Sequence, residues 1–207
     1  MMELIPNISR TLLLIIDVQN DFCPGGALAV QDGDAVIEPL NALASAVAAA
    51  GGRVAASQDW HPRGHSSFTS AGQGGLWPDH CVQGERGAAF HDKLDLNPVS
   101  LIVRKGFRRE LDSYSAFFEN DRCTPTGLEG GIKQMNIETV IIGGLATDYC
   151  VFYSAMDSRR LGFNTIVIED AVRGVNYPDG SVEKALAEMK ADGIGFSASA
   201  QLLQEIH

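Results

Sequence analysis

The chain alternates short aliphatic and β-branched runs with longer helical patterns, and this alternation restricts its fold more than any other feature. The first run, Thr11 to Asp17 (TLLLIID), has only apolar residues between its two ends. Such a run is typical of a strand that is buried on both faces of a parallel sheet. We therefore expect a three-layer α/β/α fold with a mostly parallel, Rossmann-like sheet of about six strands.

The same pattern gives the approximate bounds of each element. Strands are expected at residues 11–17, 53–57, 100–104, 139–143, 165–169 and 195–197. Helices are expected at residues 35–50, 125–135, 148–161, 179–191 and 198–206. Because the chain has no linker, repeat or low-complexity segment, residues 1–207 are expected to form a single domain. The long irregular stretch 58–98 stands out, since loops of this length in compact domains usually serve function.

Charge and cysteine usage exclude several classes of function. The formal net charge of -10 argues against nucleic acid or an anionic membrane surface as a partner. The first ten residues lack the basic start of a secretory signal, and no apolar stretch is long enough to span a bilayer. The four cysteines show no paired CxxC spacing, which predicts free thiols in a reducing compartment. We expect a cytoplasmic protein.

Two short runs predict an open metal site. Asp59 and His61 lie two apart in an extended segment, so their side chains project to one side. His80, from a separate turn, completes a set of three ligands for one divalent ion and leaves positions open for water or substrate. Zinc, iron and manganese all accept these ligands. The alternative is that both histidines are ordinary loop residues.

Chemically capable residues also follow the expected strands. Asp17 ends the first strand, Asp59 follows the second, Lys105 ends the third, Cys150 lies just past the fourth, and Asp170 follows the fifth. In open α/β sheets the ligand site lies beyond the carboxyl ends of the strands. We therefore expect these five side chains to converge on one crevice.

Cys150 is a candidate nucleophile at this crevice. It falls near the start of an expected helix that Thr147 or Asp148 would cap. The helix dipole and a nearby Lys105 ammonium would then favour the thiolate. Asp17 is placed to take the thiol proton and later give it to a leaving amine. The alternative is that Cys150 is a small buried helix residue without chemistry.

Six segments, in this order, resemble the successive motifs of nicotinamidases, which are members of the isochorismatase-like cysteine hydrolases. The segments are DVQNDF (17–22), QDWHP (58–62), WPDHCVQG (77–84), KG (105–106), DSYSAF (112–117) and GLATDYCV (144–151). Each segment alone is moderately specific, whereas their order and combination are highly specific. The resemblance extends from about Thr11 through the fifth-strand region.

The resemblance implies hydrolysis of nicotinamide to nicotinate and ammonia in NAD salvage, through a thioester intermediate, with pyrazinamide as a further substrate. It implies that Asp17, Lys105 and Cys150 form the catalytic triad. It also implies that the three metal ligands are Asp59, His61 and His80, with zinc as the first choice of ion. The ion would bind the ring nitrogen of the substrate and orient it.

The resemblance also assigns the groups around the substrate. The oxyanion hole would consist of the backbone N–H groups of Ala146 and Cys150, with a cis peptide between Leu145 and Ala146. The pyridine ring would be enclosed by three aromatic residues, Phe22, Trp77 and Tyr114. His65, four residues after His61, matches the ligand pattern less well and is not included.

Two alternatives remain open from the sequence. The first is a related amidase or isochorismatase-type hydrolase with a different substrate. Family members that act on isochorismate do not use the nucleophilic Cys, and those that act on carbamoyl substrates need no metal set, so Cys150 together with Asp59, His61 and His80 counts against each. A catalytically inactive scaffold that binds a ligand or partner protein would be expected to lack Asp17, Lys105 or Cys150, and none is missing. Homo-oligomerisation is left open.

Overall fold

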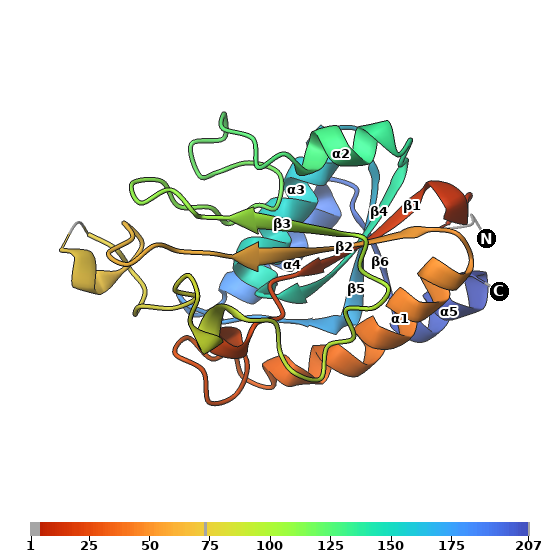
Figure 1. The fold of residues 1–207 in the computed structure, drawn as a ribbon. Helices are drawn as coiled ribbons and strands as arrows, with labels where there is room; N and C mark the ends of the chain where they lie inside the picture. The colour runs from red at the N-terminus through yellow and green to blue at the C-terminus, as the bar shows by residue number, and fades with distance from the viewer. Residues whose placement is uncertain (1–4, 73, 207) are drawn as a thin grey trace.

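A computed structural model describes residues 5–72 and 74–206, which form one parallel six-stranded sheet with helices on both faces (Figure 1). The strands are β1 (Thr11–Ile16), β2 (Arg53–Asp59), β3 (Leu101–Lys105), β4 (Thr139–Leu145), β5 (Asn164–Arg173) and β6 (Gly195–Ser197). Their spatial order is β3-β2-β1-β4-β5-β6, and every neighbouring pair is parallel. The predicted α/β/α class is confirmed.

Five α-helices cover the sheet among the described residues. They are α1 (Ile37–Ala49), α2 (Leu128–Gln134), α3 (Phe152–Arg160), α4 (Ser181–Ala191) and α5 (Ser199–Ile206). Helices α1 and α5 pack on one face, while α2, α3 and α4 cover the other (Figure 1). We find none among these helices with both the length and the apolar character needed to cross a bilayer.

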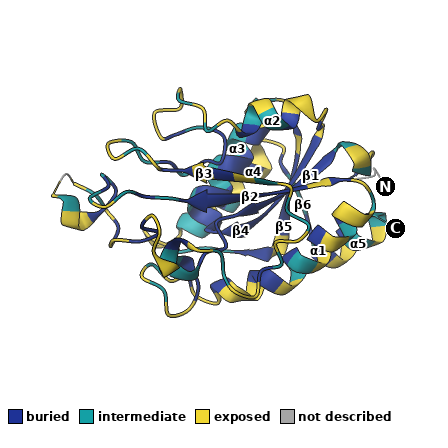
Figure 2. Ribbon diagram, in the orientation of Figure 1, coloured by how far each residue is buried: buried dark blue, intermediate teal, exposed yellow. Residues whose placement is uncertain are grey.

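Strand β1 forms the centre of the core because both of its faces are covered. Leu13 and Ile15 pack with the helix α1 side of the sheet, and Leu12, Leu14 and Ile16 pack with the opposite side. All five are buried, and Figure 2 shows the strands at the centre of the sheet mostly in the dark blue of buried residues. Burying each such side chain contributes about 1.5–3 kcal/mol. The uninterrupted apolar run in the sequence therefore corresponds to a two-sided core strand.

The order of the strands places a topological switch between β1 and β4. The chain passes from β1 to β2 and β3 on one side, and then returns to place β4 on the other side of β1. Ligands of open α/β sheets bind at such a point, beyond the carboxyl ends of the strands. The long segment 60–100 between β2 and β3 extends past these ends (Figure 1).

Two sequence expectations about local structure are wrong. A π-helical turn over Thr147–Val151 precedes α3, so no regular helix begins at Asp148. Strand β5 continues to Arg173, so Asp170 lies within it and not after it. The Asp170 carboxylate accepts a 2.7 Å hydrogen bond from the backbone N–H of Ser199, where α5 begins. It therefore stabilises a helix start away from the crevice.

Candidate active site

Lys105, the last residue of β3, lies fully buried at the centre of the site. Its Nζ lies 2.8 Å from Oδ2 of Asp17 and 2.5 Å from Oδ1 of Asp59. It also donates to the carbonyl oxygen of Ser113 at 3.1 Å and lies 3.4 Å from Sγ of Cys150. One ammonium group therefore joins residues that follow or end four different strands.

The charges of this buried group depend on one another. Burial lowers the pKa of Lys105, but Asp17 and Asp59 outweigh that effect and raise it well above its ordinary value, so the ammonium stays protonated. Burial raises the pKa of Asp17, although Lys105 opposes the increase. For Asp59, Lys105 and His61 outweigh burial and hold the pKa below its usual range. Asp59 is thus the more acidic carboxyl, and Asp17 the stronger base.

Asp17 reaches Lys105 because the chain turns sharply where β1 ends. Its φ of 48° lies in the left-handed region, which Asp tolerates better than most residues. Ser57 in β2 donates a 2.7 Å hydrogen bond to Oδ1 of Asp17. The other carboxylate oxygen, Oδ2, forms the ion pair with Lys105. The side chain is therefore held from the β2 side and the β3 side at once.

Cys150 lies buried in the π-helical turn that follows β4. Burial raises the pKa of its thiol well above the ordinary value; Lys105 lowers it, and the Asp17 and Asp59 carboxylates raise it further. The expectation of a resting thiolate is therefore wrong for this closed site. The thiol, one oxygen of Asp17 and one of Asp59 all lie within 4.8 Å of one another. A carboxylate base is thus beside the thiol.

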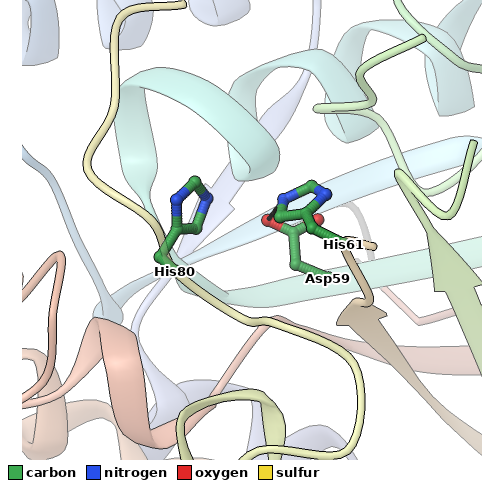
Figure 3. Close-up of side chains that lie close together, drawn as sticks. All are labelled: Asp59, His61 and His80. Atoms are coloured by element: carbon green, nitrogen blue, oxygen red, sulfur yellow. Dashed lines mark ion pairs between the residues drawn. The ribbon is translucent and has the colours of Figure 1, made fainter. Parts of the chain in front are cut away.

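Asp59, His61 and His80 come together beside this group (Figure 3). Asp59 is the last residue of β2, His61 follows two residues later, and His80 arrives from the long loop. One potential ligand atom from each side chain lies within 4.8 Å of the others. The structure thus brings together the three side chains that the sequence suggested as metal ligands.

The two imidazoles are oriented as metal ligands require. Nδ1 of His61 lies 2.8 Å from the carbonyl oxygen of Gly106, and Nδ1 of His80 lies 2.8 Å from that of Pro78. A carbonyl oxygen at Nδ1 fixes the ring proton there, so the lone pair of Nε2 is available to bind a metal ion. Nε2 of His61 lies 3.5 Å from Oδ2 of Asp59. This donor set fits zinc, iron or manganese.

The protonation of the pair also fits cation binding. Burial, followed by the neighbouring His61, lowers the pKa of His80 to about 4, so its ring is neutral at pH 7. For His61 the Asp59 carboxylate outweighs burial and raises the pKa. The carboxylate therefore favours positive charge at this point, which either a proton or a metal ion supplies.

His65, which was left out of the predicted ligand set, lies directly against it. Its ring stacks on His61 with centroids 4.2 Å apart. Its Nδ1 lies 2.7 Å from Oγ of Ser67, and its Nε2 lies 3.3 Å from the carbonyl oxygen of Leu111. Both ring nitrogens thus have protein partners, although His65, His61 and Asp112 also bring potential ligand atoms within 4.8 Å.

A largely apolar pocket opens onto both groups. The predicted residues that line it are Phe22, Asp59, His61, Trp77, His80, Tyr114, Ala146 and Cys150. Trp77 and Tyr114 are joined by a 3.1 Å hydrogen bond from indole Nε1 to the phenol oxygen. The predicted cis peptide between Leu145 and Ala146 is present at the pocket wall. Asp17 and Lys105 lie behind the lining.

The sequence interpretation missed four residues of the lining: Leu28, Asp112, Tyr149 and Val175. Asp112 and Tyr149 fall inside motifs that were already recognised, so their positions carried a signal. Leu28 and Val175 lie outside those motifs, and their place in the wall depends on how two loops pack.

Thr147 or Asp148 was expected as a helix cap, and that expectation is wrong for both. No side chain caps the turn; the Asp148 carboxylate instead accepts 2.9 Å hydrogen bonds from the backbone N–H groups of Val175 and Asn176. It also accepts a hydrogen bond from the hydroxyl of Ser181. These bonds fasten segment 174–181, which we call the strap, to the turn that carries Cys150. Val175 of the strap thereby reaches the pocket wall.

Comparison with known proteins agrees with this geometry. Residues 11–201 match the isochorismatase domain family. The chain belongs to this family. This isochorismatase-family chain is 43% identical over 205 residues to a nicotinamidase from Acinetobacter baylyi, covering 92% of this chain and 94% of the relative.

Solved structures of this family have the same fold. A nicotinamidase/pyrazinamidase from Acinetobacter baumannii superposes with a TM-score of 0.89 at 42% identity, covering 94% of this chain and 98% of the other. A pyrazinamidase from Pyrococcus horikoshii, solved in complex with zinc, superposes with a TM-score of 0.82 at 36% identity, covering 91% and 99%.

Proposed function

We propose that this protein is a nicotinamidase, a hydrolase that converts nicotinamide to nicotinate and ammonia in NAD salvage, with pyrazinamide as a second substrate. The observation that carries the proposal is the shared position of Lys105. Its ammonium contacts the Asp17 base, lies 3.4 Å from the Cys150 sulfur and pairs with the candidate metal ligand Asp59. A nucleophile and a site for a ring nitrogen therefore face one pocket.

Acylation begins with a neutral thiol. As Sγ of Cys150 attacks the carboxamide carbon, Asp17 takes the thiol proton, and the raised pKa of Asp17 makes it a better base for this transfer. The buried Lys105 ammonium stabilises the sulfur anion as it forms. The carbonyl electrons move to oxygen, where the backbone N–H groups of Ala146 and Cys150 act as the oxyanion hole.

Collapse of the tetrahedral intermediate breaks the C–N bond. Asp17 returns its proton to the departing nitrogen, so ammonia leaves and a thioester remains on Cys150. Asp17, again a carboxylate, then takes a proton from water as the water oxygen attacks the thioester. Expulsion of the sulfur releases nicotinic acid, which gives up its proton to solvent as nicotinate, and the thiolate regains a proton from Asp17.

Asp59, His61 and His80 would hold one divalent ion at the pocket wall, and zinc is the ion we propose. When bound, the ion supplies a Lewis acid for the pyridine nitrogen of the substrate. The two histidines offer Nε2 because carbonyl groups occupy Nδ1. The chain's own aromatic residues, Phe22 and the hydrogen-bonded Trp77 and Tyr114, enclose the ring.

The state of the cysteines and the net charge suggest where the protein acts and what it binds. All four cysteines are free, which suits a reducing compartment, so we place the protein in the cytoplasm. The partner that we propose is the small amide substrate. A net charge of -10 disfavours nucleic acid as a further partner.

The test is ammonia release from nicotinamide by the purified, zinc-loaded protein, with Cys150→Ala beside it. We expect release that disappears in the variant, and a wild-type mass shift of one nicotinoyl group in acid-quenched samples. Zinc-loaded wild-type protein that releases no ammonia would contradict the substrate assignment. Release that persists in Cys150→Ala would contradict the cysteine mechanism.

A further inference from the structure

Gln19 lies fully buried next to the proposed metal site, yet the chemistry above does not use it. Its carboxamide contacts the backbone of Asp59 in both directions. Nε2 donates to the Asp59 carbonyl oxygen at 2.8 Å, and Oε1 accepts from the Asp59 N–H at 2.8 Å. Nε2 also donates to the carbonyl oxygen of Ala88 at 2.9 Å. One N–H and two carbonyl groups therefore fix a single orientation of this amide.

The sheet explains why a side chain is needed here. On the β3 side, the N–H of Trp60 donates to the carbonyl oxygen of Lys105 at 3.0 Å. Because successive residues of a parallel strand direct their backbone groups to alternate neighbours, those of Asp59 face the β1 side. Strand β1, however, ends at Ile16, before this level. The carboxamide of Gln19 takes the place of the missing strand.

The position of the Asp59 backbone matters because its carboxylate serves two groups. One oxygen pairs with Lys105 at 2.5 Å, and the other lies 3.5 Å from Nε2 of His61. A rotation of the backbone at this residue would move both oxygens together. Partners behind a ligand typically change metal affinity by about 10–100-fold.

We infer that Gln19 is a positioning residue that holds Asp59 in the geometry for metal binding by acting as a one-residue extension of strand β1. The inference rests on the proposed metal set of Asp59, His61 and His80. It adds a residue that follows β1 to a site whose ligands end or follow β2, and so connects the segment after the central strand to the ion.

The test is the affinity of the metal-free protein for Zn²⁺, measured by competition with a chromophoric chelator. Gln19→Glu keeps the size of the side chain and the acceptor for the Asp59 N–H, but it loses both N–H donors. We expect Zn²⁺ affinity to fall by about 10–100-fold. We also expect KM for nicotinamide to rise more than kcat falls. Gln19→Met removes the polar contacts without adding charge. It should likewise lower the affinity for Zn²⁺ and raise KM for nicotinamide.

Gln58→Glu is the matched control. Gln58 is also buried and donates to the same Ala88 carbonyl oxygen at 2.8 Å, but that amide makes no bond to the Asp59 backbone. We expect this variant to keep the wild-type affinity, which would assign the effect to Asp59.

Each other outcome overturns a specific statement. Equal Zn²⁺ affinity in wild type and both Gln19 variants overturns the role of Gln19 alone and leaves the metal site standing. If Gln58→Glu loses as much Zn²⁺ affinity as Gln19→Glu, the effect comes from buried charge or from the contact with Ala88. That result also overturns the role of Gln19. Unfolding of both Gln19 variants assigns the residue to the fold. Wild-type protein that binds no Zn²⁺ overturns the metal site and the inference together.

Discussion

Nζ of Lys105 lies 2.5 Å from Oδ1 of Asp59, so one buried cation joins the candidate nucleophile to the candidate metal ligands. The ammonium also pairs with Asp17 at 2.8 Å and has no exposed surface. The candidate nucleophile and the candidate metal ligands therefore share one buried partner. A substitution in either half of the site should therefore affect the other half.

Replacing Lys105 by Met should damage activity and stability together. It leaves two buried carboxylates without their cation, and loss of one partner from a buried pair costs about 3–5 kcal/mol. We expect kcat/KM for nicotinamide to fall by on the order of 10³-fold or more. Urea unfolding and steady-state kinetics measure the two effects. The control, Lys133→Met, breaks only an exposed pair with Glu129 and should cost about 0.3–0.5 kcal/mol.

Gly106→Ala should displace His61. Gly106 has a φ of 61°, and an added Cβ would lie 2.4 Å from Cε1 of the His61 ring. We expect weaker Zn²⁺ binding in a chelator competition assay and a higher KM for nicotinamide. Gly130→Ala in α2 is the control, since its Cβ meets no atom within 4 Å and should stabilise the helix by about 0.5–1 kcal/mol. An unchanged Zn²⁺ affinity in Gly106→Ala would argue against His61 as a ligand.

Asp148→Asn should loosen the strap, segment 174–181. The carboxylate accepts two backbone N–H bonds and one hydroxyl bond, and bonds of this charged kind contribute about 1.5–3 kcal/mol each. We expect faster proteolysis within the strap and a raised KM, with a smaller change in kcat. Asp179→Asn, an exposed residue of the same strap, should leave proteolysis and KM as in wild type.

Three of the thiols should react with iodoacetamide in an order set by burial. Cys123 is exposed and should be alkylated first, while burial raises the pKa of Cys23 to about 11 and should keep it unreactive at pH 7.5. Cys150 lines the pocket, so we expect slow labelling that nicotinamide prevents. Peptide mass spectrometry follows each site. Labelling of Cys150 that nicotinamide leaves unchanged would place the substrate elsewhere.

Asp170 should make stability depend on pH in one direction. Burial alone would raise its pKa, but hydrogen bonds from Ser199 outweigh burial and lower it below the usual 3.8. A lowered folded-state pKa stabilises the protein above about pH 4, and that contribution disappears as pH falls through the folded-state value. Asp170→Asn should therefore be less stable than wild type at pH 7, and the difference in unfolding free energy should shrink as pH falls below the usual Asp pKa of 3.8.

The sequence predicted the sheet because short apolar and β-branched runs alternate with helical patterns along the chain. Its errors came where side chains choose partners far along the chain. Asp148 looked like a cap because Asp often caps helices, whereas three donors from the strap hold it in the structure. Cys150 looked like a resting thiolate because Lys105 was counted and burial was not. Gln19 carried no sign of its contact with Asp59.

By itself, the sequence determined the strands, their burial, and the residue types that end on one edge of the sheet, because hydrophobic periodicity and motif spacing are local properties. Only the tertiary structure decided which of those residues meet. Asp17, Asp59, Lys105 and Cys150 converge because the order β3-β2-β1-β4 brings four strand ends together, whereas Asp170 is drawn to Ser199. Protonation was decided there too, because burial and the nearest charge, both set by packing, determine each pKa.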